Sequence, residues 1–187
     1  MTSDWARVPA GIDPAKPIPR SEITVETLYL ADDGRCPNHP SLPAMILHSA
    51  LSGGSIDGIK ALYEANRWFR VWDYTVFDYH HFHPDAHEAL TVARGEAVIR
   101  LGGESGRDVE VRPGDVMVLP AGTGHKRMRA SDGFTVVGGY PKGQEARTIR
   151  VADKAASDAV RREVAGVGLP ATDPVYGAEG PLFEAWR

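Results

Sequence analysis

Cysteine is almost absent from this chain, because Cys36 is the single one among 187 residues. One cysteine excludes an internal disulfide bond and a zinc site built from cysteines. No apolar run approaches the roughly 18 residues of a membrane-spanning helix. The first residues also lack the charged and apolar segments of a secretory signal. We therefore expect a cytoplasmic protein with no membrane partner.

A strongly basic region is also lacking, because 21 Lys and Arg residues stand against 25 Asp and Glu residues and give a net charge of −4. A nucleic-acid partner is therefore not expected. Glycine and proline are plentiful by contrast, with 20 and 14 residues. This composition is typical of folds with many short strands and tight turns, and helix bundles have less use for it.

The pattern of apolar residues predicts a single domain over residues 1–187, in three parts. Residues 1–70 are expected to form an N-terminal arm, strands and one short helix. Residues 71–141 form the barrel core, and residues 142–187 form a strand, a helix and a tail. The core consists of strand-like runs separated by turn clusters, as in an antiparallel sandwich or barrel. The predicted fold class is therefore all-β.

Two helices are expected outside the core. The first covers about 56–66, with Ser55 as its N-cap. The second covers about 154–164, with Asp153 as its N-cap and Asp158 and Arg162 as an i,i+4 pair. The apolar tail that follows packs back onto the barrel or onto a second subunit.

Histidine is concentrated in the core, where His81 and His83 lie two residues apart in the strand-like run 71–83. Side chains of a strand alternate between its faces, so both imidazoles point to the same side. Glu88 opens the next strand after a short turn. Two imidazoles and a carboxylate would thus meet at one end of a hairpin, a set of donors that suits a divalent metal. His87, beside Glu88, turns away, and we assign it a supporting or interface role.

Two longer motifs contain these residues. HFHPDAHEALTVARG has the pattern H-x-H-x4-E-x6-G, with His81, His83 and Glu88 at its first three fixed positions. GDVMVLPAGTGH has the pattern G-x5-P-x-G-x2-H and ends in His125. Together they resemble the two signature motifs of the cupin superfamily, over roughly residues 71–141. The segments ETLYLADDG and ATDPVYGAEGPL are further similar to the YjlB-like cupins, a bacterial group of unassigned activity.

The resemblance implies a double-stranded β-helix, the jelly-roll or cupin barrel, with an N-terminal arm, one short helix before the barrel and a C-terminal helix. It also implies one divalent metal ion per chain, whether Fe, Mn, Ni, Cu or Zn, bound by His81, His83, Glu88 and His125. Arg129 stands where the second motif often has Asn. Because that position is not a ligand in the family, the departure concerns the pocket rather than the metal.

Strand alternation also predicts what surrounds the metal. The predicted substrate pocket comprises Phe77, Tyr79, Leu90, Arg127 and Arg129. An inward guanidinium needs a carboxylate, from a ligand or from a nearby Glu of the protein. If the carboxylate comes from a ligand, the substrate is a small anionic molecule, such as a hydroxy acid, a keto acid or an acidic sugar.

Three functions fit this centre, and no catalytic residue is assigned among them. A redox metal favours dioxygenase-type chemistry, a Lewis acid favours isomerisation or hydrolysis, and a binding protein would use the same pocket without turnover. A homodimer is expected, because cupin-like barrels leave sheet edges that need cover and the tail offers Leu182, Phe183 and Trp186 as apolar surface.

Overall fold

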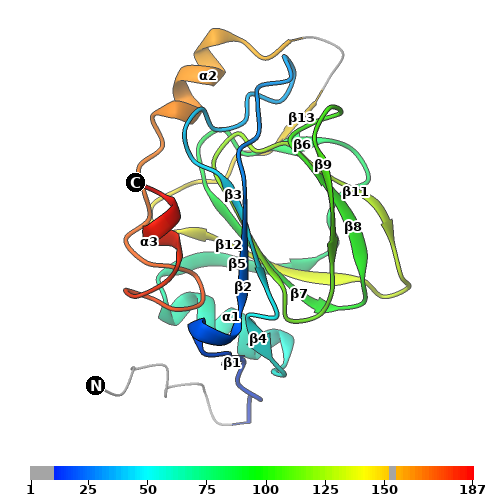
Figure 1. Ribbon diagram of the computed structural model, residues 1–187, viewed down its shortest axis with the longest axis vertical. Coiled ribbons are helices and arrows are strands. Elements are labelled where there is room, and N and C mark those ends of the chain that lie inside the picture. The colour runs from blue at the N-terminus through cyan, green and yellow to red at the C-terminus, as the bar shows by residue number, and fades with distance from the viewer. Residues whose placement is uncertain (1–10, 152–154) are drawn as a thin grey trace.

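The computed structural model describes residues 11–151 and 155–187, which fold into facing antiparallel sheets with short helices outside them (Figure 1). In chain order the strands and helices are β1 (Lys16–Pro17), a 3-10 turn (Arg20–Glu22), β2 (Thr24–Leu28), β3 (Ala44–His48), β4 (Leu51–Ser52), α1 (Ile56–Ala65), β5 (Trp68–Tyr74), β6 (His81–Phe82), β7 (Glu88–Arg94), β8 (Ala97–Leu101), β9 (Arg107–Val111), β10 (Val116–Leu119), β11 (His125–Ala130), β12 (Thr135–Pro141), β13 (Ile149–Arg150), α2 (Asp158–Ala165) and α3 (Leu182–Ala185).

The order of the strands is that of a jelly roll. One sheet runs β2-β3-β10-β7-β12-β5 and the facing sheet runs β13-β6-β11-β8-β9. Neighbours in each sheet come from distant parts of the sequence, since β3 pairs with β10 and β12 pairs with both β5 and β7. A short ribbon of β1 and β4 attaches the arm to the body. The predicted double-stranded β-helix is confirmed.

The inner strands β3, β10 and β7 of the six-stranded sheet are buried on both faces. Alternation along β3 sends Ala44 and Ile46 into the apolar cluster between the sheets, and Met45 and Leu47 into a second cluster on the outer face. The outer cluster also holds residues of α1 and of the C-terminal segment. Figure 1 shows α1 and α3 outside the barrel, so these helices cover the sheet and leave its inner face to the site.

Helix α1 agrees closely with its prediction. It covers Ile56–Ala65, and the Ser55 side chain accepts a hydrogen bond from the Gly58 amide, which is the expected N-cap. Its buried face ends in Tyr63, whose hydroxyl hydrogen-bonds the Thr91 hydroxyl at 2.8 Å. Among the described residues, no helix combines the length and apolar character that a membrane span requires.

Two predictions are wrong, namely the start of the second helix and the continuity of the strand before the histidines. Helix α2 begins at Asp158 with Ser157 as its N-cap, and Asp158 pairs with Arg161 at 3.6 Å. The residue expected to cap it, Asp153, lies outside the described residues. The run 71–83 is not one strand, because residues 75–80 leave the six-stranded sheet and cross to the facing one before β6 begins.

The tail packs onto the barrel next to the predicted site. Trp186 is 3% exposed, and its indole N–H donates to the Pro43 carbonyl at 2.9 Å. Its ring lies 4.7 Å from the ring of His87, measured between centroids. The last residues of the chain are therefore part of the core that supports the site.

Replacing Trp186 by Ala should lower the free energy of unfolding by about 3–5 kcal/mol, the usual cost of removing a large buried aromatic side chain. Phe183 lies on the same helical turn and is 37% exposed, so Phe183→Ala is the matched control and should cost much less. Urea denaturation measures both values. Equal losses in the two variants would show that the tail does not pack as described.

Candidate metal centre

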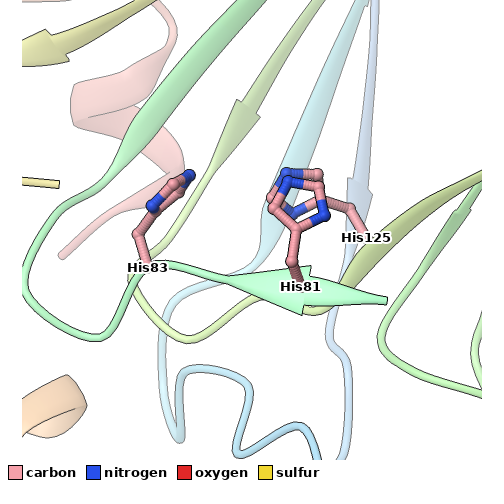
Figure 2. Close-up of side chains that lie close together, drawn as sticks. All are labelled: His81, His83 and His125. Carbon is pink, nitrogen blue, oxygen red and sulfur yellow. The ribbon is translucent and has the colours of Figure 1, made fainter. Parts of the chain in front are cut away.

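Three histidines converge in the space between the sheets. His81 on β6 and His125 on β11 are direct partners across the five-stranded sheet, with ring centroids 3.9 Å apart. His83 follows β6, and one ring nitrogen of each histidine lies within 4.8 Å of the others. Figure 2 shows the rings of His81 and His83 projecting to the same side of the chain, toward the ring of His125. All three side chains are buried.

Main-chain carbonyls fix the orientation of each ring. The Nδ1 atoms of the three histidines lie 3.3, 3.2 and 3.0 Å from carbonyl oxygens of Tyr79, Arg147 and Thr123, in the order His81, His83 and His125. A carbonyl only accepts, so the hydrogen-bond network assigns the proton of each ring to Nδ1. Each Nε2 then keeps its lone pair, as a metal ligand requires.

Glu88 brings a carboxylate to the same place from the opposite sheet. It begins β7 and is 2% exposed. Its Oε1 lies 3.2 Å from His83 Nε2, and its Oε2 lies 3.2 Å from His125 Nε2. Oε2 has no partner with hydrogen-bond geometry in the described part of the chain. A buried carboxylate facing bare nitrogen atoms is unfavourable unless a cation or a proton lies between them.

The charges of the centre follow from burial and from this pairing. Burial would raise the pKa of Glu88, but the His83 and His125 imidazoles hold the pKa of the carboxyl well below its ordinary value. Burial likewise opposes the charged form of His83, yet the negative charge of Glu88 outweighs it and raises the pKa of His83. For His81, burial and the neighbouring His125 lower the pKa to about 3.

The donor set fits a divalent metal ion. Three imidazole nitrogens and one carboxylate oxygen are borderline and hard donors without sulfur, which suits Fe, Mn, Ni, Cu or Zn. A metal ion would satisfy the lone pairs of the three Nε2 atoms and the unpartnered Oε2 of Glu88 at once. The three histidines are therefore placed to bind a metal, and Glu88 as the fourth ligand stays a prediction.

His87 faces away from the three histidines and has a structural role. Its Nδ1 accepts the Ala121 amide at 3.0 Å, and its Nε2 donates to the Gly168 carbonyl at 3.2 Å. Both ring nitrogens are therefore occupied. The ring joins the loop before His125 to the C-terminal segment.

Tyr140 is part of the centre although no sequence motif pointed to it. It lies on β12, is 8% exposed, and its ring centroid is 5.4 Å from that of His83. The indole N–H of Trp72 donates to its hydroxyl at 3.0 Å. Burial raises the pKa of Tyr140, and the negative charge of Glu88 raises it further. The pairing of β5 with β12 brings Trp72 and Tyr140 together, and local spacing does not reveal this pairing.

The predicted aromatic residues lie beside the histidines. The Phe77 ring contacts the His81 ring edge-on at 4.9 Å, and the Tyr79 ring lies 5.9 Å from it. Phe77 is 37% exposed, so the cluster reaches from solvent to a buried histidine. Leu90 lies two residues after Glu88 on β7 and belongs to the apolar cluster between the sheets.

The two arginines of β11 have different positions, and the inward prediction for Arg129 is wrong. The pairing of β11 with β8 shifts register between Arg127 and Arg129, so simple alternation fails there. The Arg129 side chain is 73% exposed and pairs with Glu110 at 3.1 Å, which is the alternative of an internal Arg–Glu pair. Arg127, before the shift, is half-buried, and its Nε donates to the Val76 carbonyl at 3.1 Å.

Comparisons with known proteins agree with this architecture. A family model described as a cupin domain matches residues 70–136. The uncharacterized protein YjlB of Bacillus subtilis is 38% identical over 165 residues, which cover 88% of this chain and 98% of that protein.

Solved structures show weaker likeness. A conserved protein of Klebsiella pneumoniae with a double-stranded β-helix domain is 16% identical, with a TM-score of 0.36, over 73% of this chain and 84% of that one. A mutant of Bacillus subtilis oxalate decarboxylase is 15% identical, with a TM-score of 0.33, over 72% of this chain and 29% of that one.

The buried His87 should make stability depend on pH. Burial, with the nearby His39, lowers the pKa of His87 from 6.5 to about 3. Between these values the unfolded chain binds a proton at this position and the folded chain does not. The contribution of neutral His87 to the free energy of unfolding is therefore fully present above pH 6.5. It is lost as the pH falls toward 3. For the metal-free protein this amounts to about 2 kcal/mol between pH 7 and pH 5.

The variant His87→Gln tests this contribution, because a side-chain amide can accept from Ala121 and donate to Gly168 without titrating. Urea denaturation at pH 7 and pH 5 should show a smaller acid-induced loss in the variant than in the wild type. An unchanged loss would mean that His87 is not buried in its neutral form.

Proposed function

Because this chain belongs to the YjlB-like group of the cupin superfamily, we propose that it is a metal-dependent enzyme that acts on a small anionic molecule. One observation carries the proposal: one ring nitrogen of each of the three buried histidines lies within 4.8 Å of the others, while each Nδ1 faces a main-chain carbonyl. The ligands of the metal are His81, His83, His125 and Glu88.

The proposed chemistry is of the dioxygenase type, because the donor set suits a redox metal. A metal held by these four ligands would bind the oxygen atoms of a substrate at its remaining positions. When bound, a redox metal would supply the electron transfer that lets O2 react with a chelated acid. A dioxygenase places both oxygen atoms in the product and takes the electrons from the substrate, so no separate reductant is needed.

Arg127 supports the choice of an anionic substrate. It lies two residues after His125 on β11, before the register shift, and so faces the same side of the sheet. Its Nε is engaged by Val76, whereas its two terminal nitrogens have no partner within residues 11–151 and 155–187. A half-buried guanidinium with free N–H groups can hold a carboxylate through two parallel hydrogen bonds.

Metal content tests the first part of the proposal. Protein purified without chelators or metal-affinity resin should contain about one divalent metal per chain. His83→Ala and His125→Ala should each lose most of it, because each removes one ligand. His48 is a partly exposed histidine of β3, so His48→Ala is the control and should keep the metal.

Wild-type metal content in both ligand variants would show that the metal is held elsewhere. Oxygen uptake by the loaded protein with a panel of hydroxy and keto acids then separates the activities. Uptake with product formation supports a dioxygenase. Turnover without uptake indicates an isomerase, and binding without turnover indicates a binding protein.

Arg127→Gln should weaken the binding of small carboxylates to the loaded protein by about 1.5–3 kcal/mol, the range for hydrogen bonds to charged groups. Arg129→Gln is the matched control on the same strand, and it should leave binding unchanged because its side chain is exposed and paired with Glu110. Isothermal titration calorimetry measures both, with metal content checked in each variant. The assignment fails if the two variants lose affinity equally.

A further inference from the structure

An exposed aromatic cluster lies at the edge of the centre. Tyr74, Phe77 and Tyr79 succeed one another where β5 ends and the chain crosses toward β6. The Tyr74 and Phe77 rings lie 6.5 Å apart, and Tyr74 and Phe77 are 62% and 37% exposed. Single exposed aromatic side chains are ordinary, whereas contiguous exposed apolar groups are typical of surfaces that bind a ligand or a partner.

Contacts with neighbouring groups fix the rings of the cluster. Phe77 stacks on Tyr79 with centroids 4.9 Å apart and planes within 10° of parallel. The Arg150 guanidinium lies 4.1 Å from the centre of the Tyr79 ring. The Phe77 carbonyl accepts the Arg127 amide at 2.8 Å. A ring held in this way loses little freedom when a ligand stacks against it.

The aromatic and the charged features adjoin each other. The guanidinium Nε of Arg127 donates to the carbonyl of Val76, the residue before Phe77, and the Phe77 ring contacts the His81 ring. A ligand that chelates at the histidines and places a carboxylate near Arg127 would therefore extend over or beside the Phe77 ring. An aliphatic acid would leave that exposed ring uncovered, whereas a flat ring would stack on it.

We propose that the substrate is an aromatic hydroxy-carboxylate, and that Phe77 determines this specificity by stacking on the substrate ring. The inference rests on the proposed function, since it assigns a substrate class to the same metal centre. Phe77 is a specificity-determining residue here, because it contacts the ring and leaves the metal and the carboxylate to other groups.

The test compares two acids that place their oxygens alike. Salicylate has a flat ring, and cis-2-hydroxycyclohexanecarboxylate has a saturated ring of similar size. Both are titrated calorimetrically into metal-loaded wild type and into Phe77→Leu. In each protein the affinity for salicylate is divided by the affinity for the saturated acid, and this ratio is compared between wild type and variant. Differences in metal chelation between the two acids then cancel. Phe69→Leu is the matched control, because Phe69 is also 37% exposed and lies on β5.

The wild type should bind salicylate, and Phe77→Leu should weaken that binding about 3- to 10-fold, as expected for the loss of one aromatic contact. The saturated acid should change less than about twofold. Phe77→Tyr retains the ring and should keep the preference, and Phe69→Leu should match the wild type. Thermal melts establish that each variant is folded.

Three results would overturn the inference. They are an unchanged affinity ratio in Phe77→Leu, an equal change in Phe69→Leu, and no salicylate binding by wild type that holds its metal. The proposed function fails separately, through a lack of bound metal. A patch that is instead covered by a second copy of this chain would give no discrimination between the acids, and Phe77→Leu would change the mass measured by light scattering.

Discussion

The structure depends on a charge placed where water cannot reach it. Glu88 begins a strand in the middle of the six-stranded sheet, and its carboxylate is 2% exposed. An isolated carboxylate at such a position would be protonated or would destabilise the fold. The imidazoles of His83 and His125, each 3.2 Å from one of its oxygens, lower its pKa, and a proton or a cation between nitrogen and oxygen makes this pairing favourable. The fold accommodates this group because the facing sheet brings two polar partners to it.

Three loops orient the histidine rings of the centre. The carbonyls that fix the rings belong to Tyr79, Thr123 and Arg147, which lie in three separate connections between strands. The loop between β10 and β11 is bonded to an N-terminal residue and, through His87, to the C-terminal segment. The Asn38 side chain accepts the Gly124 amide at 3.1 Å, and His87 accepts the Ala121 amide while it bonds the C-terminal segment. The arm and the tail are therefore structural parts of the centre.

The sequence predicts those parts of the centre that lie within one hairpin or one motif. The spacing of His81, His83 and Glu88, with the resemblance that added His125, named the residues that meet. The sequence does not predict the positions of side chains that depend on how distant strands pair. The register shift in β11 moves Arg129 outward, and no residue type announces it. Tyr140 reaches the centre because β12 pairs with β5 and β7, a contact between distant segments that periodicity does not report.

Helix α2 has a consequence for how firmly His83 is held. Gly122 has φ +80°, and a side-chain carbon there would come within 2.7 Å of Val164 on α2. The Gly122 amide donates to the His83 carbonyl at 2.8 Å, and Arg147, whose carbonyl holds the His83 ring, pairs with Glu163 of the same helix. Detachment of α2 would release both supports of His83 in a single local unfolding event. Opening of this helix would therefore loosen a ligand that lies on a different segment of the chain.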